Sequence, residues 1–334
     1  MATNVDAIKN EILRYVSKKP EVLQAALLSK DVFLHQHAKT ITKVKGEYPS
    51  IQGLMSHVVQ SFYSKSFTPF GDLKFYKKTL RNYRQKIDFQ FDPADVLGTV
   101  LEDMYEENKD RDQMSISKMA IDMLKAKIID DVNILSIKGV YDPASVGNAT
   151  PTFGTSMDGL NEIIADLKAD VVNPVYSIPG SAITSANVLA QVTAFERGIP
   201  EAQKSNVKKI FMSVTDAEDY IIAYEDTFGQ NKFQNNAATT RLGKREIVAV
   251  PNLTQGTLFA TTPNNFLELV DIKENPAEIS DVQVDKRIVN VLGEFTLGYD
   301  FAMNQAVYIH TTDGVKVLGL NNAEQNGLFY PSQF

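Results

Sequence analysis

The chain has 334 residues, 43 % of them hydrophobic and 22 % charged, and its formal charge at pH 7 is −7. This composition is ordinary for globular proteins and excludes a disordered or collagen-like chain, while the length predicts two domains. The lack of cysteine excludes disulfides, thiolate metal sites and a cysteine nucleophile, and the acidic balance argues against a molecule that clamps nucleic acid over its whole surface.

Residues 1–60 are predicted to form a polar, helical N-terminal arm. The helical pattern is interrupted at Pro20, Gly46 and Pro49, and Leu23 and Leu27 belong to a weak apolar stripe. An arm that packs on another part of the molecule and an independent domain both fit this pattern. Charges interrupt the start of the chain, unlike in a signal peptide, and no run of about 18 apolar residues occurs. We therefore expect a soluble protein made in the cytoplasm, with no membrane partner.

Residues 61–91 interleave aromatic and basic side chains. Seven basic and two acidic residues give this segment a charge of +5. Its end alternates in polarity from Tyr83 to Phe91, which indicates a strand with one wet face. A nucleic-acid surface and a projecting β-hairpin that packs on a partner have the same composition, and we expect a two-stranded arm that protrudes from the subunit.

The next segment is acidic and leads into a long helix. Residues 92–112 contain eight acidic and two basic residues, a charge of −6, and Pro93 suits the first turn of a helix. From Met114 to Lys138 apolar residues recur at three- and four-residue spacing, and Gly139 suits the end of the helix. A helix of this length would span roughly 37 Å, which is typical of a structural spine.

An alternation of helices and strands follows a loop rich in glycine, proline and asparagine. Helices are predicted around 160–167, with Asp158 as the cap, and around 188–198. A further helix at 215–229 has capping-box spacing between Thr215 and Glu218. Strands are predicted at 208–214, 245–251, 257–262, 265–271 and 306–309. The stretch from Asp285 to Phe301 contains two glycines, and helix and strand both remain open there.

We find no constellation of catalytic residues in the sequence. None of the phosphate-loop, dinucleotide, nucleophile-elbow or metalloprotease motifs occurs. His35 and His37 are two positions apart, which on a helix places them on different faces. Neighbouring acids such as Asp130 and Asp131 fit the solvated face of a helix. The residues alone thus make an enzyme a weak hypothesis, and they offer no catalytic, cofactor or metal site to propose.

The order of these features resembles the major capsid protein of tailed double-stranded DNA bacteriophages. The closest local resemblances are IKGVYDP, KKIFMSVTDAEDYIIAYEDTFG, GKREIVAVPNLTQGTLFATTPNNFLELVD and VLGEFTLGYDFAMNQAVYI. The resemblance implies an α+β, HK97-like capsid fold with an N-terminal helical arm, an extended β-hairpin loop, a spine helix in a peripheral domain and an α/β axial domain. The implied parts are an arm at 1–60, a loop at 61–91, a peripheral domain at 92–139 and 263–298, and an axial domain at 140–262 and 299–334.

The same resemblance implies a structural function without catalysis, so that the protein is expected not to be an enzyme, and it implies partners. The subunit would assemble with itself, as pentamers and hexamers, into an icosahedral head in the bacterial host cytoplasm and would end in the virion. Scaffolding, portal and decoration proteins would be further partners, and packaged double-stranded DNA would be enclosed without specific contacts. An encapsulin-like shell around protein cargo and a soluble metabolic enzyme are the alternatives.

The two charged segments suggest a contact between subunits. An extended arm carries its tip far from its own root, so each basic segment could lie on the acidic helix of a neighbour. Both segments could instead be solvated faces. The contact hypothesis names the following residues: Lys74, Lys77, Lys78, Arg81, Arg84, Glu102, Glu106 and Glu107.

Overall fold

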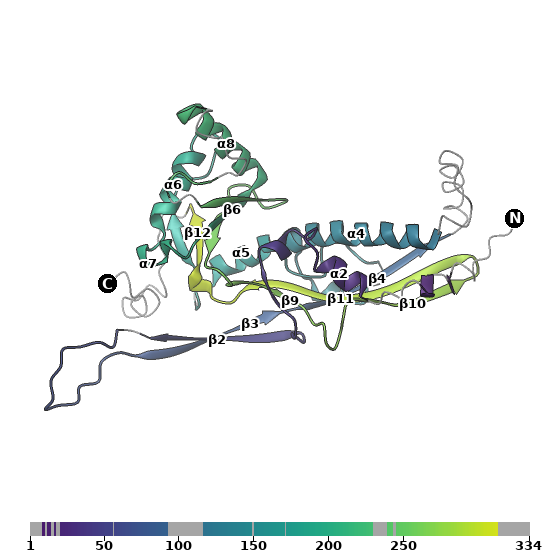
Figure 1. The fold of residues 1–334 in the computed structure, drawn as a ribbon, viewed down its shortest axis with the longest axis horizontal. Helices are drawn as coiled ribbons and strands as arrows, with labels where there is room; N and C mark the ends of the chain where they lie inside the picture. The colour runs from purple at the N-terminus through teal and green to yellow at the C-terminus, as the bar shows by residue number, and fades with distance from the viewer. Residues whose placement is uncertain are drawn as a thin grey trace.

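The computed structural model shows an elongated body, an upright lobe and a projecting two-stranded arm (Figure 1). It describes residues 9–10, 12–14, 17, 21–55, 57–92, 116–148, 150–170, 172–229, 239–242 and 245–312. The predicted acidic helix after Asp92 therefore lies outside the described residues. None of the helices in the described part of the chain is long and apolar enough to cross a membrane.

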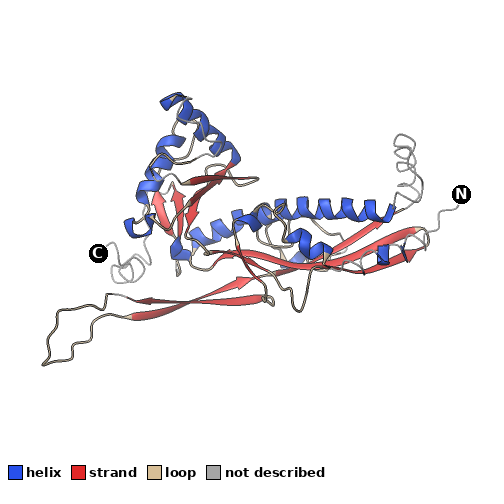
Figure 2. Ribbon diagram, in the orientation of Figure 1, coloured by secondary structure: helices blue, strands red, loops and turns tan. Residues whose placement is uncertain are grey.

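The elongated body consists of a long sheet with the predicted spine helix along it (Figure 2). The strand order is β1-β9-β11-β10, and β4 pairs with β11 as well. The helix, α4, spans Ile116–Lys138 and buries the apolar residues whose spacing predicted it, such as Ile121 and Leu135. The strands are β1 (Lys39–Ile41), β4 (Tyr83–Phe91), β9 (Phe266–Leu269), β10 (Glu278–Asp285) and β11 (Ile288–Phe301).

The ambiguous stretch before residue 301 is a strand, β11, despite its two glycines. Its side chains alternate, and Val289, Val291 and Phe295 are buried. At Gly298 the strand passes the backbone of the arm root so closely that a Cβ atom would lie 2.3 Å from the Arg81 carbonyl oxygen. Glycine is therefore required here by close approach. The proposed boundary between residues 298 and 299 falls inside this strand.

The upright lobe is an α/β unit. Its sheet has the order β5-β12-β8-β6-β7. The strands are β5 (Tyr176–Pro179), β6 (Lys209–Ser213), β7 (Glu246–Val250), β8 (Leu258–Thr261) and β12 (Val307–Thr311). The helices of the lobe are α6 (Val188–Gly198), α7 (Glu201–Lys204) and α8 (Val214–Phe228). The helix α5 (Leu160–Ala169) lies beside α4 and shares the core of the body, and short 3₁₀ turns occur at η3 (Pro143–Ser145) and η5 (Asn304–Ala306).

Two predicted helix caps are wrong. Ser213 caps α8, because its hydroxyl accepts the Asp216 backbone N–H, so the capping residue lies two positions before the predicted Thr215. Gly159 precedes α5, and Asp158 instead accepts the backbone N–H of Tyr141 at 2.8 Å. Asp158 thus links the segment that follows α4 to the segment that precedes α5.

The N-terminal segment is less helical than predicted. The described residues 9–10, 12–14 and 17 are helical. After them come α2 (Val22–Leu27), the turn η1 (Leu34–Gln36), β1 and a second strand, β2 (Glu47–Met55), so strands replace the predicted helix beyond residue 38. Leu23 and Leu27 are buried in the same core as α4. The described residues before β2 are thus integrated into the elongated body.

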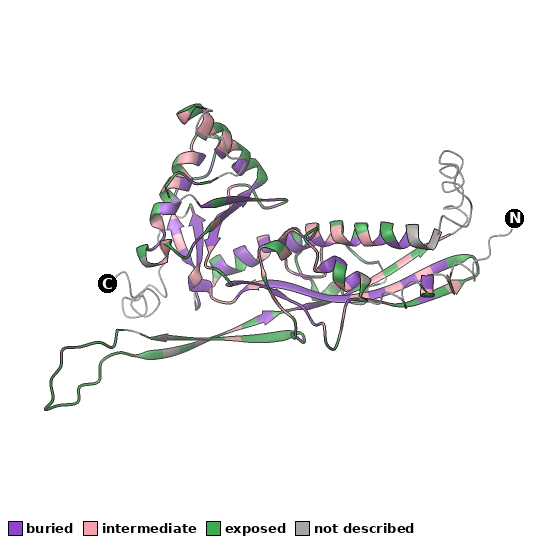
Figure 3. Ribbon diagram, viewed as in Figure 1, coloured by how far each residue is buried: buried purple, intermediate pink, exposed green. Residues whose placement is uncertain are grey.

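A continuous core joins the body to the upright lobe. Phe211 on β6 stacks on Phe259 of β8 with ring centroids 4.9 Å apart, and Phe259 meets Phe301 of β11 edge-on at 6.1 Å. A second cluster lies in the lobe and includes Phe195 of α6 and Tyr220 of α8. Figure 3 shows buried residues in the lobe sheet and along the middle of the long sheet, and exposed residues over most of the arm.

Candidate functional site

The projecting arm is a pair of antiparallel strands, β2 and β3 (Leu73–Arg81), that pair from Glu47 opposite Arg81 to Met55 opposite Leu73. The predicted loop at 61–91 is therefore shifted. Its last strand, β4, belongs to the body and pairs with β11 over nine residues. We refer to residues 57–72 as the tip.

The two faces of the arm differ in their surroundings. Because directly opposite residues share a face, one face, which we call the outward face, carries Pro49/Thr79, Ile51/Lys77, Gly53/Phe75 and Met55/Leu73. Ile51 is 67 % exposed and Phe75 is 70 % exposed. On the inward face Leu80 is buried and Tyr76 packs against the core of the upright lobe. The subunit thus covers part of the inward face, at Tyr76, Lys78 and Leu80, and leaves the outward face in solvent.

The tip continues this exposed apolar surface. Phe62 and Phe67 are each 92 % exposed. The other exposed apolar residues of the tip are Val58, Val59, Tyr63 and Phe70. Exposed apolar side chains gathered in one segment are typical of interaction surfaces, and an isolated hairpin is marginally stable in water.

Polar contacts hold the root of the arm to the body. The Lys78 Nζ atom donates to Asp300 Oδ1 at 2.6 Å and to the Phe301 carbonyl oxygen at 2.9 Å. Opposite Lys78 on the same face, the Ser50 hydroxyl donates to the Ala302 carbonyl oxygen at 3.1 Å. Burial raises the pKa of Asp300, although Lys78 counteracts this.

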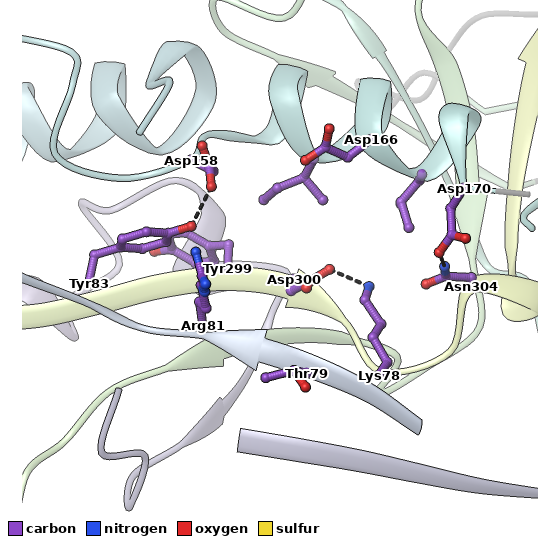
Figure 4. Close-up of a pocket in the computed structure, with 12 residues that line it drawn as sticks. Lys78, Thr79, Arg81, Tyr83, Asp158, Asp166, Asp170, Tyr299, Asp300 and Asn304 are labelled. Atoms are coloured by element: carbon purple, nitrogen blue, oxygen red, sulfur yellow. Dashed lines mark hydrogen bonds and ion pairs between the residues drawn. The ribbon is translucent and has the colours of Figure 1, made fainter. Parts of the chain in front are cut away.

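A polar cleft of about 350 Å³ lies between the arm root, α5 and β11 (Figure 4). The carboxylates that line it include Asp158, which accepts the Tyr83 hydroxyl, and Asp170, which accepts the Asn304 amide at 3.4 Å. Burial and the bond to Asp158 raise the pKa of Tyr83. No three metal-binding side chains come together among the described residues. Asp158, Asp170 and Asp300 thus join different elements across the cleft, whereas the carboxylate of Asp166 lines it without a partner among the described residues.

The structure places the predicted basic residues in different surroundings. Lys77 lies exposed on the outward face, whereas Lys78 is engaged by Asp300 of its own subunit. Arg84 lies on the body and pairs with Glu294 at 2.5 Å, and Arg81 approaches Glu47 at 3.7 Å. For Lys74 the backbone alone is described, and Glu102, Glu106 and Glu107 lie outside the described residues. The contact between these groups in neighbouring subunits stays a prediction.

Sequence reasoning missed Ser50 and Asp300. Asp300 follows Lys78 by 222 positions, and no local pattern connects residues so far apart. The segment around Ser50 contains a proline and a glycine, which weaken a strand pattern.

Comparisons with known proteins identify the fold. No protein-family model matches the sequence, and no curated protein matches it. The structure is similar to a chain of the satellite phage P4 procapsid with its size determination (Sid) protein, with a TM-score of 0.52 and 10 % identity, over 89 % of this chain and 99 % of that one. It is similar to a capsid chain of the native GTA particle, with a TM-score of 0.54 and 11 % identity, over 84 % and 90 %. A capsid chain of cyanophage A-1(L) has a TM-score of 0.53 and 11 % identity, over 86 % and 91 %. The chain thus has the predicted α+β, HK97-like capsid fold.

Proposed function

We propose that the chain is the structural major capsid protein of a tailed bacteriophage, and that it assembles with itself into an icosahedral head around double-stranded DNA. The observation that carries the proposal is the arm, which exposes the apolar outward face and the aromatic tip. Such a surface is costly for a monomer, because each exposed phenylalanine forgoes about 1.5–3 kcal/mol of burial. A second copy of the chain, placed to cover this surface, recovers that free energy.

In a closed ring of identical subunits, a neighbouring copy can cover every arm at the same time. A contact in which the arm of one copy lies on a different surface of the next is heterologous, and it closes into a ring when the rotation between copies is suitable. Pentamers and hexamers are the rings that this proposal requires. The −7 charge of the subunit agrees with a wall that encloses DNA without binding it tightly.

The further partners follow from the same proposal. Scaffolding, portal and decoration proteins would contact the shell, assembly would take place in the bacterial host cytoplasm, and the protein would end in the virion. The proposal assigns no catalytic activity to the chain.

Electron microscopy of the purified chain tests the proposal. We expect closed shells or isolated rings of subunits. Particles that remain monomers or small oligomers at all concentrations and salt conditions would favour a metabolic enzyme instead. Shells that are loaded with a host protein, and that lack DNA when isolated from infected cells, would favour a cargo shell.

Charge reversal at Lys77 is expected to weaken assembly modestly. Lys77 is exposed on the outward face and makes no ion pair with a described residue. Because an exposed ion pair contributes about 0–1 kcal/mol, Lys77→Glu should raise the critical concentration for assembly roughly two- to fivefold. Light scattering at several salt concentrations measures this change. Adding Glu106→Lys with Glu107→Lys to this variant should reverse part of the increase in critical concentration. If Lys77→Glu has the same critical concentration as the parent, the contact is not electrostatic.

A further inference from the structure

The arm joins the body at a narrow pivot. The Asn82 backbone N–H donates to the Gly46 carbonyl oxygen at 2.8 Å, and the Asn82 side chain donates to the Val44 carbonyl oxygen at 2.8 Å. Gly46 has a φ of 71°, a conformation that favours glycine. Gly298 of β11 leaves just enough space for this crossing. Both strands of the arm therefore enter the body through one hydrogen-bonded pair of positions.

A second attachment lies four residues farther out. Ser50 and Lys78 face each other across the two strands, and both bind the same short segment, residues 300–302. We call these contacts the clasp. The apolar packing of Tyr76 nearby has little directional preference, whereas a charge-assisted hydrogen bond fixes distance and direction. The pivot and the clasp together fix the direction in which the arm leaves the body.

Small changes at the clasp are amplified along the arm. At about 3.4 Å per residue, Lys78 lies about 14 Å from the pivot and the end of β3 lies about 30 Å from it. A sideways displacement of the arm at the clasp therefore becomes roughly twice as large at the end of β3. The cleft of about 350 Å³ beside the clasp leaves open space between the arm root and α5. Close packing on every side would resist a movement of the arm root. On the side that faces the cleft, the arm root is not closely packed.

We propose that Lys78 and Asp300 are positioning residues that set the angle at which the arm leaves the body. In the assembled shell, that angle sets the curvature. This link to curvature rests on the proposed assembly function. The pair is suited to a reversible adjustment, because a partly buried ion pair recovers little beyond the cost of its own desolvation. Lys78 is 16 % exposed and Asp300 is 17 % exposed, so water reaches both partners.

Spin labels on the unassembled full-length chain test the angle directly. The sequence contains no cysteine, so Lys65→Cys on the tip and Ala126→Cys on α4 provide two unique labelling sites, both exposed. We expect a single narrow distance distribution in the labelled parent. Lys78→Met should broaden and shift it, and Lys78→Arg, which keeps the charge, should restore most of the parent distribution.

Lys77→Met is the matched control, because Lys77 is the adjacent lysine on the opposite face. It should leave the distance distribution unchanged. If Lys78→Met keeps the parent distribution and lowers only the unfolding temperature, the pair is purely structural and the proposal is overturned. If Lys78→Met fails to fold, the double variant Lys78→Met with Asp300→Leu, which leaves no unpaired charge, takes its place and should broaden the distribution in the same way.

Assembly gives the second readout. Shells of the Lys78→Met variant should vary in diameter, whereas shells of the parent and of Lys78→Arg should be uniform. Uniform shells from a variant with a broadened distance distribution would overturn the link to curvature. A parent that forms no shells would overturn the proposed function and leave the distance result standing.

Discussion

Replacing residues 51–77 by an Asn-Gly turn should abolish shell formation and leave the subunit folded. The replacement joins Ser50 to Lys78, which are opposite each other in β2 and β3, and a two-residue Asn-Gly loop suits such a hairpin. It removes the tip and most of the outward face but keeps the pivot, the clasp and both sheets. Circular dichroism and thermal unfolding would report an intact fold, and electron microscopy would report the loss of shells.

A deletion of residues 61–91 is the instructive comparison. That deletion removes β4, which pairs with β11 along nine residues in the body, so we expect it to unfold the long sheet. The short replacement at 51–77 separates the role of the arm from the stability of the body. Normal shells from the short replacement would contradict the proposed role of the arm.

The double variant Phe62→Ser with Phe67→Ser should raise the critical concentration for assembly about 100-fold or more. Both side chains are 92 % exposed in the subunit. If a neighbour buries them, each contributes about 1.5–3 kcal/mol, and together about 3–6 kcal/mol for every contact. Light scattering across a dilution series measures the critical concentration. Subunit stability should not fall, because neither side chain belongs to the core.

Ser61→Ala with Ser66→Ala provides the matched control. These serines stand next to the two phenylalanines in the same tip, and their replacement should leave the critical concentration close to that of the parent. An unchanged critical concentration in the phenylalanine variant would place the tip in solvent in the shell, and the docking surface would then be limited to the outward face.

Strong local periodicity made several elements predictable from the sequence. The apolar spacing of residues 114–138 predicted α4, and alternation predicted β4, because in both cases a single face is buried against one neighbour. The strands of the upright lobe, such as β6 and β7, were predictable because they are short apolar runs between helices and turns.

Elements whose stability comes from distant partners were not predictable. β2 contains Pro49 and Gly53 and exposes apolar residues, so its pairing with β3 has no clear local signal. β10 is a polar strand, and its position depends on pairing with β11. The basic, aromatic composition thus predicts a hairpin but not its strands, since β3 pairs with β2 and β4 pairs with β11.

The assembly surface was only partly predictable for the same reason. Sequence composition identified the basic arm, but it could not separate Lys77, which is exposed, from Lys78, which is bound to Asp300. Alternation along β3 places these neighbours on opposite faces, yet which face meets the body depends on residues 300–302. That segment is far away in the sequence and is brought to the arm by the fold of β11.

Whether neighbouring copies cover the arm can be seen in a cryo-electron microscopy reconstruction of particles formed by the purified chain. We expect a closed shell in which the tip and the outward face of each arm, including Phe62, Phe67 and Phe75, are covered by a neighbouring copy. A chain that forms no shell, or a shell in which each arm contacts its own subunit and solvent alone, would contradict this expectation.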